Sequence, residues 1–125
     1  MTAPTTGLCF TPDGSSLVAV PWQSSNVMIY RVEDGTIMRH FATRGFSDDV
    51  AVAANGCIYV SSRNGRHVSM FDPRGEMLSS WDSARDTKDP AIETGDMFGR
   101  GTLVLSQNKL YVLSTKASYV QVYTV

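Results

Sequence analysis

Hydrophobic residues in this chain occur in short uninterrupted runs, separated by clusters of turn-forming residues. Leu17–Val20, Val27–Tyr30 and Leu110–Leu113 are each apolar at four consecutive positions. A strand with one solvated face alternates apolar and polar residues, whereas a strand covered on both faces can be apolar throughout. No stretch is long and amphipathic enough to compete as a helix. The pattern predicts an all-β fold whose strands are covered on both faces.

The runs fall into three similar units. Gly14 and Gly56 take the same place in the first two units and are 42 positions apart, and a second pair of turn glycines, Gly35 and Gly75, is 40 apart. A period near forty with several short strands per unit is typical of β-propeller blades, here of four antiparallel strands. We therefore predict one propeller domain over residues 1–125, with blade 1 at 7–43, blade 2 at 48–82, a polar insertion at 83–99 and a truncated blade 3 at 101–125.

The second unit defines the expected strands most clearly. Asn55-Gly56 stands between two apolar runs, which indicates a two-residue hairpin turn with positive φ at both central residues. Asp72-Pro73-Arg74-Gly75 fits another tight turn. The strands predicted for this unit are 50–53, 57–61, 67–71 and 76–81.

The second unit also resembles an NHL repeat, one kind of propeller blade. The matching residues are Val50-Ala51-Val52, Asn55-Gly56, Ile58-Tyr59-Val60 and Phe71-Asp72. The first unit, through Phe10-Thr11-Pro12-Asp13-Gly14, fits a WD-repeat or lactonase-type blade equally well. The chain departs from the NHL pattern where the family prefers Asp after the second strand (Pro21, Ser62, Ser114) and Arg at the start of the third (Asn26, His67, Tyr119). The resemblance therefore implies a divergent member of the family.

The resemblance implies three kinds of function: holding a protein partner, reading single-stranded RNA, or catalysis at a metal in the central channel. A channel metal requires several converging ligands, but His40 and His67 fall on different strands of their units. Asp48 and Asp49 are the only carboxylates expected beside an inner strand. We predict no enzymatic activity, no cofactor and no metal site.

Charge argues against nucleic acid as the main partner. The chain has 11 Lys and Arg against 12 Asp and Glu, whereas phosphate contacts require an excess of basic residues. Trp, Tyr and Arg are enriched where proteins bind one another. We predict a non-catalytic platform that binds a protein partner, with single-stranded RNA binding or a metal-dependent lyase or lactonase as alternatives. The expected binding residues lie at one face: Trp22, Gln23, Arg44, Arg63, Arg66, His67, Lys116 and Tyr119.

Three blades also predict self-association, because closed propellers contain about four to eight blades. A lone wedge of blades would expose apolar strands to water. We expect a homodimer that closes a ring of about six blades, and a fragment of a longer polypeptide is the alternative.

The remaining sequence features concern the cellular compartment. Cys9 and Cys57 lie in apolar runs, which predicts buried free thiols. The N-terminus lacks the charged and apolar segments of a signal peptide, and no apolar stretch is long enough to span a bilayer. We expect an intracellular, cytoplasmic protein.

Overall fold

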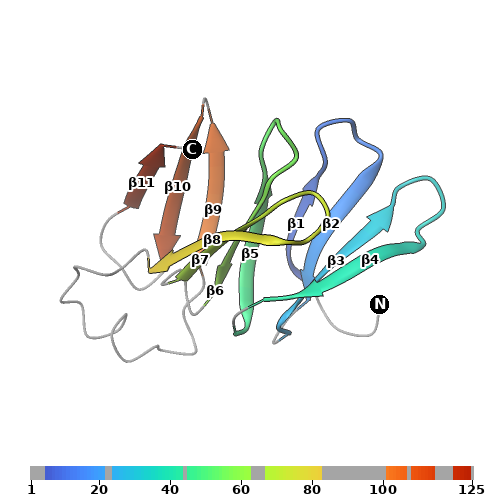
Figure 1. Cartoon of the computed structure of the whole chain (residues 1–125), viewed down its shortest axis with the longest axis horizontal. Coiled ribbons are helices and arrows are strands. Elements are labelled where there is room, and N and C mark those ends of the chain that lie inside the picture. The colour runs from blue at the N-terminus through green and yellow to red at the C-terminus, as the bar shows by residue number, and fades with distance from the viewer. Residues whose placement is uncertain are drawn as a thin grey trace.

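The computed structural model describes residues 5–21, 24–43, 45–62, 67–82, 101–106, 108–114 and 120–124. These residues form eleven strands in three antiparallel sheets and include no helix (Figure 1). The predicted all-β fold with blade-like sheets is therefore confirmed. The polar insertion predicted at 83–99 lies outside the described residues.

Each sheet is one blade, and its strands follow one another in chain order. Blade 1 contains β1 (Thr5–Phe10), β2 (Ser16–Pro21), β3 (Asn26–Arg31) and β4 (Ile37–Ala42). Blade 2 contains β5 (Ser47–Val52), β6 (Ile58–Ser62), β7 (His67–Phe71) and β8 (Met77–Asp82). Blade 3 contains β9 (Gly101–Ser106), β10 (Lys109–Ser114) and β11 (Val120–Thr124).

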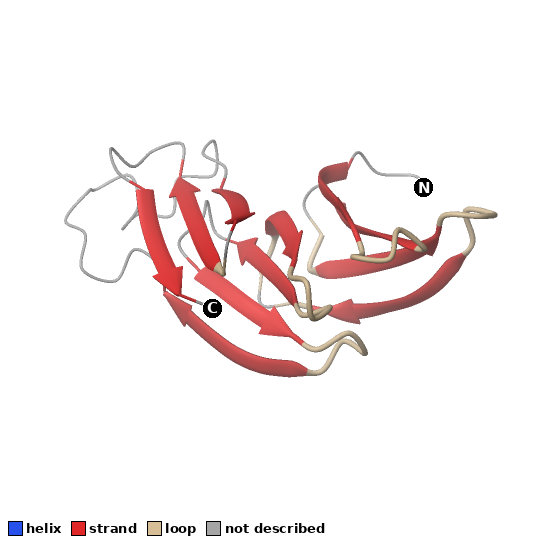
Figure 2. Cartoon of the chain, turned by 90° about the horizontal axis from the view of Figure 1, so that it is seen from above, coloured by secondary structure: helices blue, strands red, loops and turns tan. Residues whose placement is uncertain are grey.

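The three blades stack face to face along an arc (Figure 2). Their first strands lie side by side, with β5 in contact with both β1 and β9. These strands therefore form the inner edge of the stack, as the innermost strands of propeller blades do.

Tight turns join the first strand of each four-stranded blade to the second, and the third to the fourth. In blade 2, Gly56 N donates to Ala53 O (2.9 Å) and Ala53 N donates to Cys57 O (2.9 Å), so the loop between the paired residues is three residues long. Gly56 has φ +89°, whereas among described non-glycine residues only Asn108 has positive φ. The predicted two-residue turn is therefore wrong. The hairpin is a three-residue loop closed by a glycine, a common alternative geometry.

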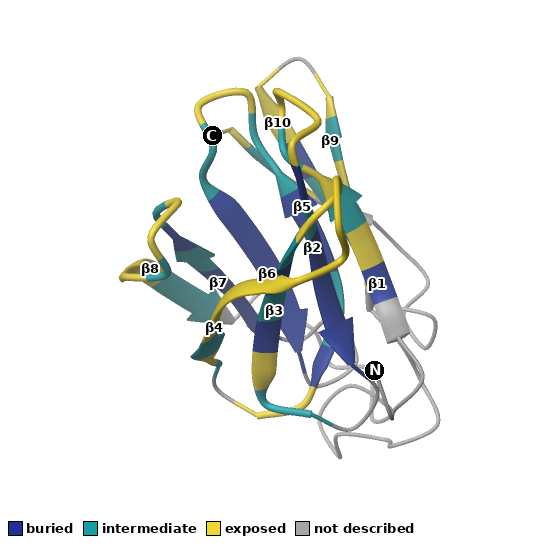
Figure 3. Cartoon of the chain, turned by 90° about the vertical axis from the view of Figure 1, so that its right-hand side faces the viewer, coloured by how far each residue is buried: buried dark blue, intermediate teal, exposed yellow. Residues whose placement is uncertain are grey.

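The burial of a strand depends on its place within its blade. The second strands are the most buried, with five of six residues buried in β2 and all five in β6, whereas every residue of the fourth strand β4 is exposed except the half-buried Phe41. The prediction of strands covered on both faces is thus confirmed for β2 and β6, whereas Val27–Tyr30 in β3 alternates between buried and half-buried residues. Within the described part of the chain, blade 1 has a neighbouring blade on one face only, and its other face is visible in Figure 3.

Two apolar clusters join the blades. Between blades 1 and 2, Val18 and Val20 pack with Val50 and Val60. Between blades 2 and 3, Tyr59 packs with Leu110 and Val112. Burial of such side chains stabilises the fold by roughly 1.5–3 kcal/mol each, so the joints between blades are the hydrophobic core of the chain.

Two further predictions need correction. The first strand of blade 2 begins at Ser47 and not at residue 50, because the register shifts between Ser47 and Asp49 and a bulge accommodates the polar residues. Cys9 and Cys57 are free thiols, as predicted, but both are only partly buried.

Candidate functional site

The candidate binding residues adjoin strand ends that all lie at the same end of the three sheets. Pro21, Ser62 and Ser114 end the second strands of the three blades, and the antiparallel third strands begin at the same end. Seven of the eight candidates lie outside the described residues, and their role stays a prediction: Trp22, Gln23, Arg44, Arg63, Arg66, Lys116 and Tyr119.

His67 is the candidate that the structure places. It begins β7, as predicted, and stands in register with Ser62 on β6 and Asp82 on β8. Only 9% of its surface is exposed. The histidine therefore offers little area to a partner.

His67 belongs to a layer of small polar residues that sequence analysis missed. Ser47, Ser62 and Ser69 are all buried, and Ser47 stands in register with Ser62. The hydroxyls of Thr43 and Ser47 lie 3.0 Å apart, and Ser47 N donates to Ser24 O of the preceding blade (3.1 Å). For Ser62 and Ser69, the signal was present as serines inside mainly apolar strands. Through Ser47, this layer ties blade 1 to blade 2 directly below the strand ends that carry the candidates.

Asp49 makes a second polar connection, this time at the inner edge. Its Oδ1 accepts a hydrogen bond from Val50 N (2.9 Å) and its Oδ2 accepts one from Leu103 N of blade 3 (2.9 Å). Burial raises the pKa of the Asp49 carboxyl, although both hydrogen bonds oppose the shift. Asp49 thus joins the first strands of two blades. Among the described residues, no three His, Cys, Asp or Glu side chains are grouped closely enough to hold a metal ion.

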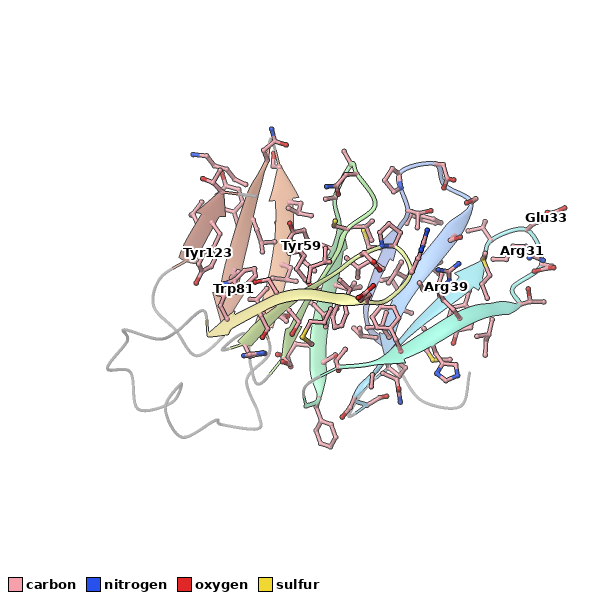
Figure 4. All side chains as sticks on the ribbon, viewed as in Figure 1. Arg31, Glu33, Arg39, Tyr59, Trp81 and Tyr123 are labelled. Carbon is pink, nitrogen blue, oxygen red and sulfur yellow. The ribbon has the colours of Figure 1, made fainter. Side chains whose placement is uncertain are left out.

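Within the described part of the joint between blades 2 and 3, two buried polar atoms have no hydrogen-bond partner. They are Ser61 Oγ and Trp81 Nε1. Both residues lie in the cross-strand row that also contains Asp49. The Trp81 ring packs edge-on against Tyr123 of blade 3, with centroids 5.3 Å apart (Figure 4). Trp81 therefore has a structural role at this joint.

A surface hollow of about 430 Å³ lies at the opposite end of blade 1. It is lined by residues of the β1–β2 and β3–β4 turns, such as Glu33, and by Arg31 and Met38 from the adjoining strands. Arg31 and Glu33 are labelled in Figure 4. Arg31 Nη1 is 3.4 Å from Asp34 Oδ2, and both side chains are about half exposed. An exposed pair of this kind contributes little to stability, roughly 0–1 kcal/mol, and the hollow brings no reactive groups together.

Comparison with known proteins establishes the fold. No protein-family model matches the sequence, and no curated protein matches it. Solved structures do match, at low sequence identity. The structure of U3-55K has a TM-score of 0.76 at 17% identity over 100% of this chain, and the RRP9 WD40 repeats have a TM-score of 0.75 at 17% identity over 100%. Hydrazine synthase of Kuenenia stuttgartiensis has a TM-score of 0.73 at 17% identity over 99%.

These similarities show that the chain has a β-propeller fold. The chain covers 37%, 36% and 34% of the three matched chains, so it spans about a third of their length. Among the described residues, no helix is long and apolar enough to cross a membrane. Function is carried by sites and not by the fold, so the function of this chain is argued from its own residues.

Proposed function

We propose that the chain is a non-catalytic β-propeller platform of the NHL type, which holds a protein partner at one end of its blades. The partner would contact the segments that join β2 to β3, β4 to β5, β6 to β7 and β10 to β11. The proposal is supported by the fold and by the difference between the two ends of the sheets.

That difference is the observation that carries the proposal. At one end, the turns are short and stabilised by their own side chains: Asp13 Oδ1 accepts from Ser15 N (3.0 Å), and Asp72 Oδ1 accepts from Arg74 N (2.9 Å). At the other end of the sheets, the chain continues from the strands into the connections that contain residues 22–23, 44 and 63–66. Binding residues commonly occupy such connections on a rigid scaffold.

The chemistry of these connections favours a protein partner. They contain Trp22, Tyr119 and Arg63, which are of the residue types enriched at the energetic centres of protein interfaces. The scaffold beneath is firm, because the buried polar layer and the apolar joint below it hold blades 1 and 2 together. A partner would thus meet groups held in place by packed strands.

The test compares two arginines of blade 2. Arg63 follows β6 at the proposed binding end, whereas the exposed Arg74 lies in the turn at the opposite end. The whole chain is immobilised, and the proteins that it retains from a cell extract are identified and quantified. We expect Trp22→Ala and Arg63→Ala to reduce retention by about tenfold or more, and Arg74→Ala to leave it unchanged. Equal retention by all variants would contradict the proposed site.

The same preparation tests the alternatives. An RNA-binding platform would bind a labelled single-stranded pool, with an affinity that falls steeply as salt rises. A channel metal would persist through dialysis in stoichiometric amount. Either result would replace the protein-platform proposal.

A further inference from the structure

The cross-strand registers align the three blades residue by residue. Leu8 stands opposite Ala19 in blade 1, as Val50 stands opposite Val60 in blade 2 and Leu103 opposite Val112 in blade 3. Side chains alternate between the two faces of a sheet. We call the face that contains these pairs the front face of each blade, and the opposite face its back face.

Both joints in the chain pair a back face with a front face. Val18 and Val20, on the back of blade 1, pack with Val50 on the front of blade 2. In the same way Ala51, on the back of blade 2, belongs to one cluster with Leu103 on the front of blade 3. The same back-to-front packing of neighbouring blades therefore occurs twice within one molecule.

The front face of blade 1 has the features of such a joint but no neighbour among the described residues. Leu8 is 56% exposed, whereas its counterparts Val50 and Leu103 are 3% and 6% exposed. Phe10 on the same face is also exposed. An apolar surface of this kind usually marks a site of association.

Tyr30 places an aromatic side chain on this face, as the front faces of the other two blades also have. By register it corresponds to Phe71 in blade 2 and Tyr123 in blade 3. Each counterpart packs against an aromatic ring of the preceding blade: Phe41 contacts Phe71 with centroids 4.8 Å apart, and Trp81 contacts Tyr123. Tyr30 occupies the same position in a blade without a preceding neighbour in the described structure.

The back face of blade 3 is the complementary open surface. Val104 is 54% exposed, whereas its counterpart in blade 2, Ala51, is 6% exposed. Val122 is exposed on the same face, next to Tyr111 in the register. The described residues of both open faces are mainly uncharged, so no strong electrostatic term opposes their pairing.

We propose that the front face of blade 1 binds the back face of blade 3 of a second copy, so that two chains close one ring of about six blades. One chain supplies both halves of the joint, which is why a second copy is the occupant that the internal repeat favours. Two identical head-to-tail joints satisfy both open faces and form a closed assembly. The joint lies on the blade faces, whereas the proposed partner site lies at the strand ends, so either proposal can fail without the other.

The first test measures the mass of the full chain in solution by sedimentation equilibrium at micromolar concentration. We expect twice the chain mass of 13.7 kDa. Leu8→Glu and Val104→Glu should each raise the dissociation constant about a hundredfold or more, because each buries a charge in an apolar joint. Leu78→Glu is the matched control, since Leu78 is 52% exposed on β8, away from the open faces. Leu8→Val should still dimerise, because the equivalent residue of blade 2 is Val50.

The second test establishes the direction of the joint. A mixture of the Leu8→Glu and Val104→Glu variants retains one intact front face and one intact back face, so we expect it to recover a heterodimer with one joint. Front-to-front pairing would instead leave Val104→Glu fully dimeric on its own. A monomeric wild-type chain, or a dimer that Val104→Glu does not weaken, would overturn the proposal. Unchanged circular dichroism spectra would show that the variants are folded.

Discussion

The carboxylate of Asp49 occupies the space that a side chain at Gly7 would fill. A Cβ atom at position 7 would lie 2.6 Å from Asp49 Oδ1 and 2.8 Å from Asp49 Cα. The two residues are counterparts in the registers of blades 1 and 2. The missing side chain in one blade therefore lets the carboxylate of the next reach Leu103 in the third.

We predict that Gly7→Ala destabilises the chain by roughly 1–3 kcal/mol through overpacking. Backbone strain does not contribute, because Gly7 is not among the glycines with positive φ. Urea denaturation followed by circular dichroism measures the change. In the Asp49→Ala background the cost should be smaller, since one of the two overlaps disappears. A cost that is the same in both backgrounds would contradict the contact.

Asp49 should also leave a signature in the pH dependence of stability. Burial raises the pKa of its carboxyl in the folded state, so the folded chain retains this proton to higher pH than the unfolded chain. The contribution of Asp49 is therefore most favourable at acidic pH and decreases as pH rises through the raised pKa. We expect the free energy of unfolding of wild type, relative to Asp49→Asn, to fall as pH rises from strongly acidic toward neutral.

The comparison with Asp49→Asn removes the opposing contributions of other carboxyls. Hydrogen bonds from Ser15 and Thr11 lower the pKa of Asp13, and those from Thr36, together with Arg31, lower the pKa of Asp34. Both groups therefore stabilise the fold above their ordinary pKa and lose this effect in acid. They are present in both proteins, so the difference reports Asp49. A difference that stays constant or increases with pH would contradict the assignment.

The sequence predicts the strands well because their turns are local. The strand predicted at 67–71 is observed as His67–Phe71, and Gly56 and Gly75 both close turns. The start of β5 was missed because a bulge at Ser47 and Asp49 places polar residues inside a strand. Local hydrophobic patterns do not encode such a bulge.

The candidate site was less predictable because it depends on contacts between blades. His67 stands at the start of a strand, where a polar residue is usually solvated, but neighbouring strands bury it. The bridging role of Asp49 requires a glycine 42 positions before it and a backbone N–H 54 positions after it. A single sequence carries no signal for pairs so far apart.

The aromatic pairs at the joints should contribute to stability beyond their burial. Phe71 is almost fully buried and its ring is tilted 47° to that of Phe41. We expect Phe71→Ala to cost about 3–5 kcal/mol, and a double-mutant cycle with Phe41→Ala to show a coupling of about 0.5–1.5 kcal/mol. Leu78→Ala, at an exposed site on β8, should change stability by less than about 0.5 kcal/mol. A coupling near zero would show that the rings do not interact.

The last prediction concerns the turn of blade 2 that contacts blade 1. Arg39 Nη1 donates to Pro73 O in this turn (3.1 Å), and a Cβ at Gly75 would lie 2.5 Å from the Phe41 ring. Gly75 has φ +94°, and Gly35 takes the same place in blade 1 with φ +72° but nothing within 4 Å. An alanine at either position would therefore be strained by the positive φ. Only at position 75 would its methyl group also meet a neighbouring side chain.

We expect Gly35→Ala to cost about 1–2 kcal/mol, because an L-residue is strained at positive φ. Gly75→Ala should cost roughly 1–3 kcal/mol more, because its methyl group would displace the Phe41 ring from the joint. In the Phe41→Ala background the extra cost should disappear, since the ring that the methyl meets is gone. Urea denaturation measures the free energy of unfolding of six proteins. They are the parent, Gly35→Ala and Gly75→Ala, each with Phe41 intact and with Phe41→Ala. Equal costs for the two glycines in the native background would mean that the turn of blade 2 does not pack on blade 1.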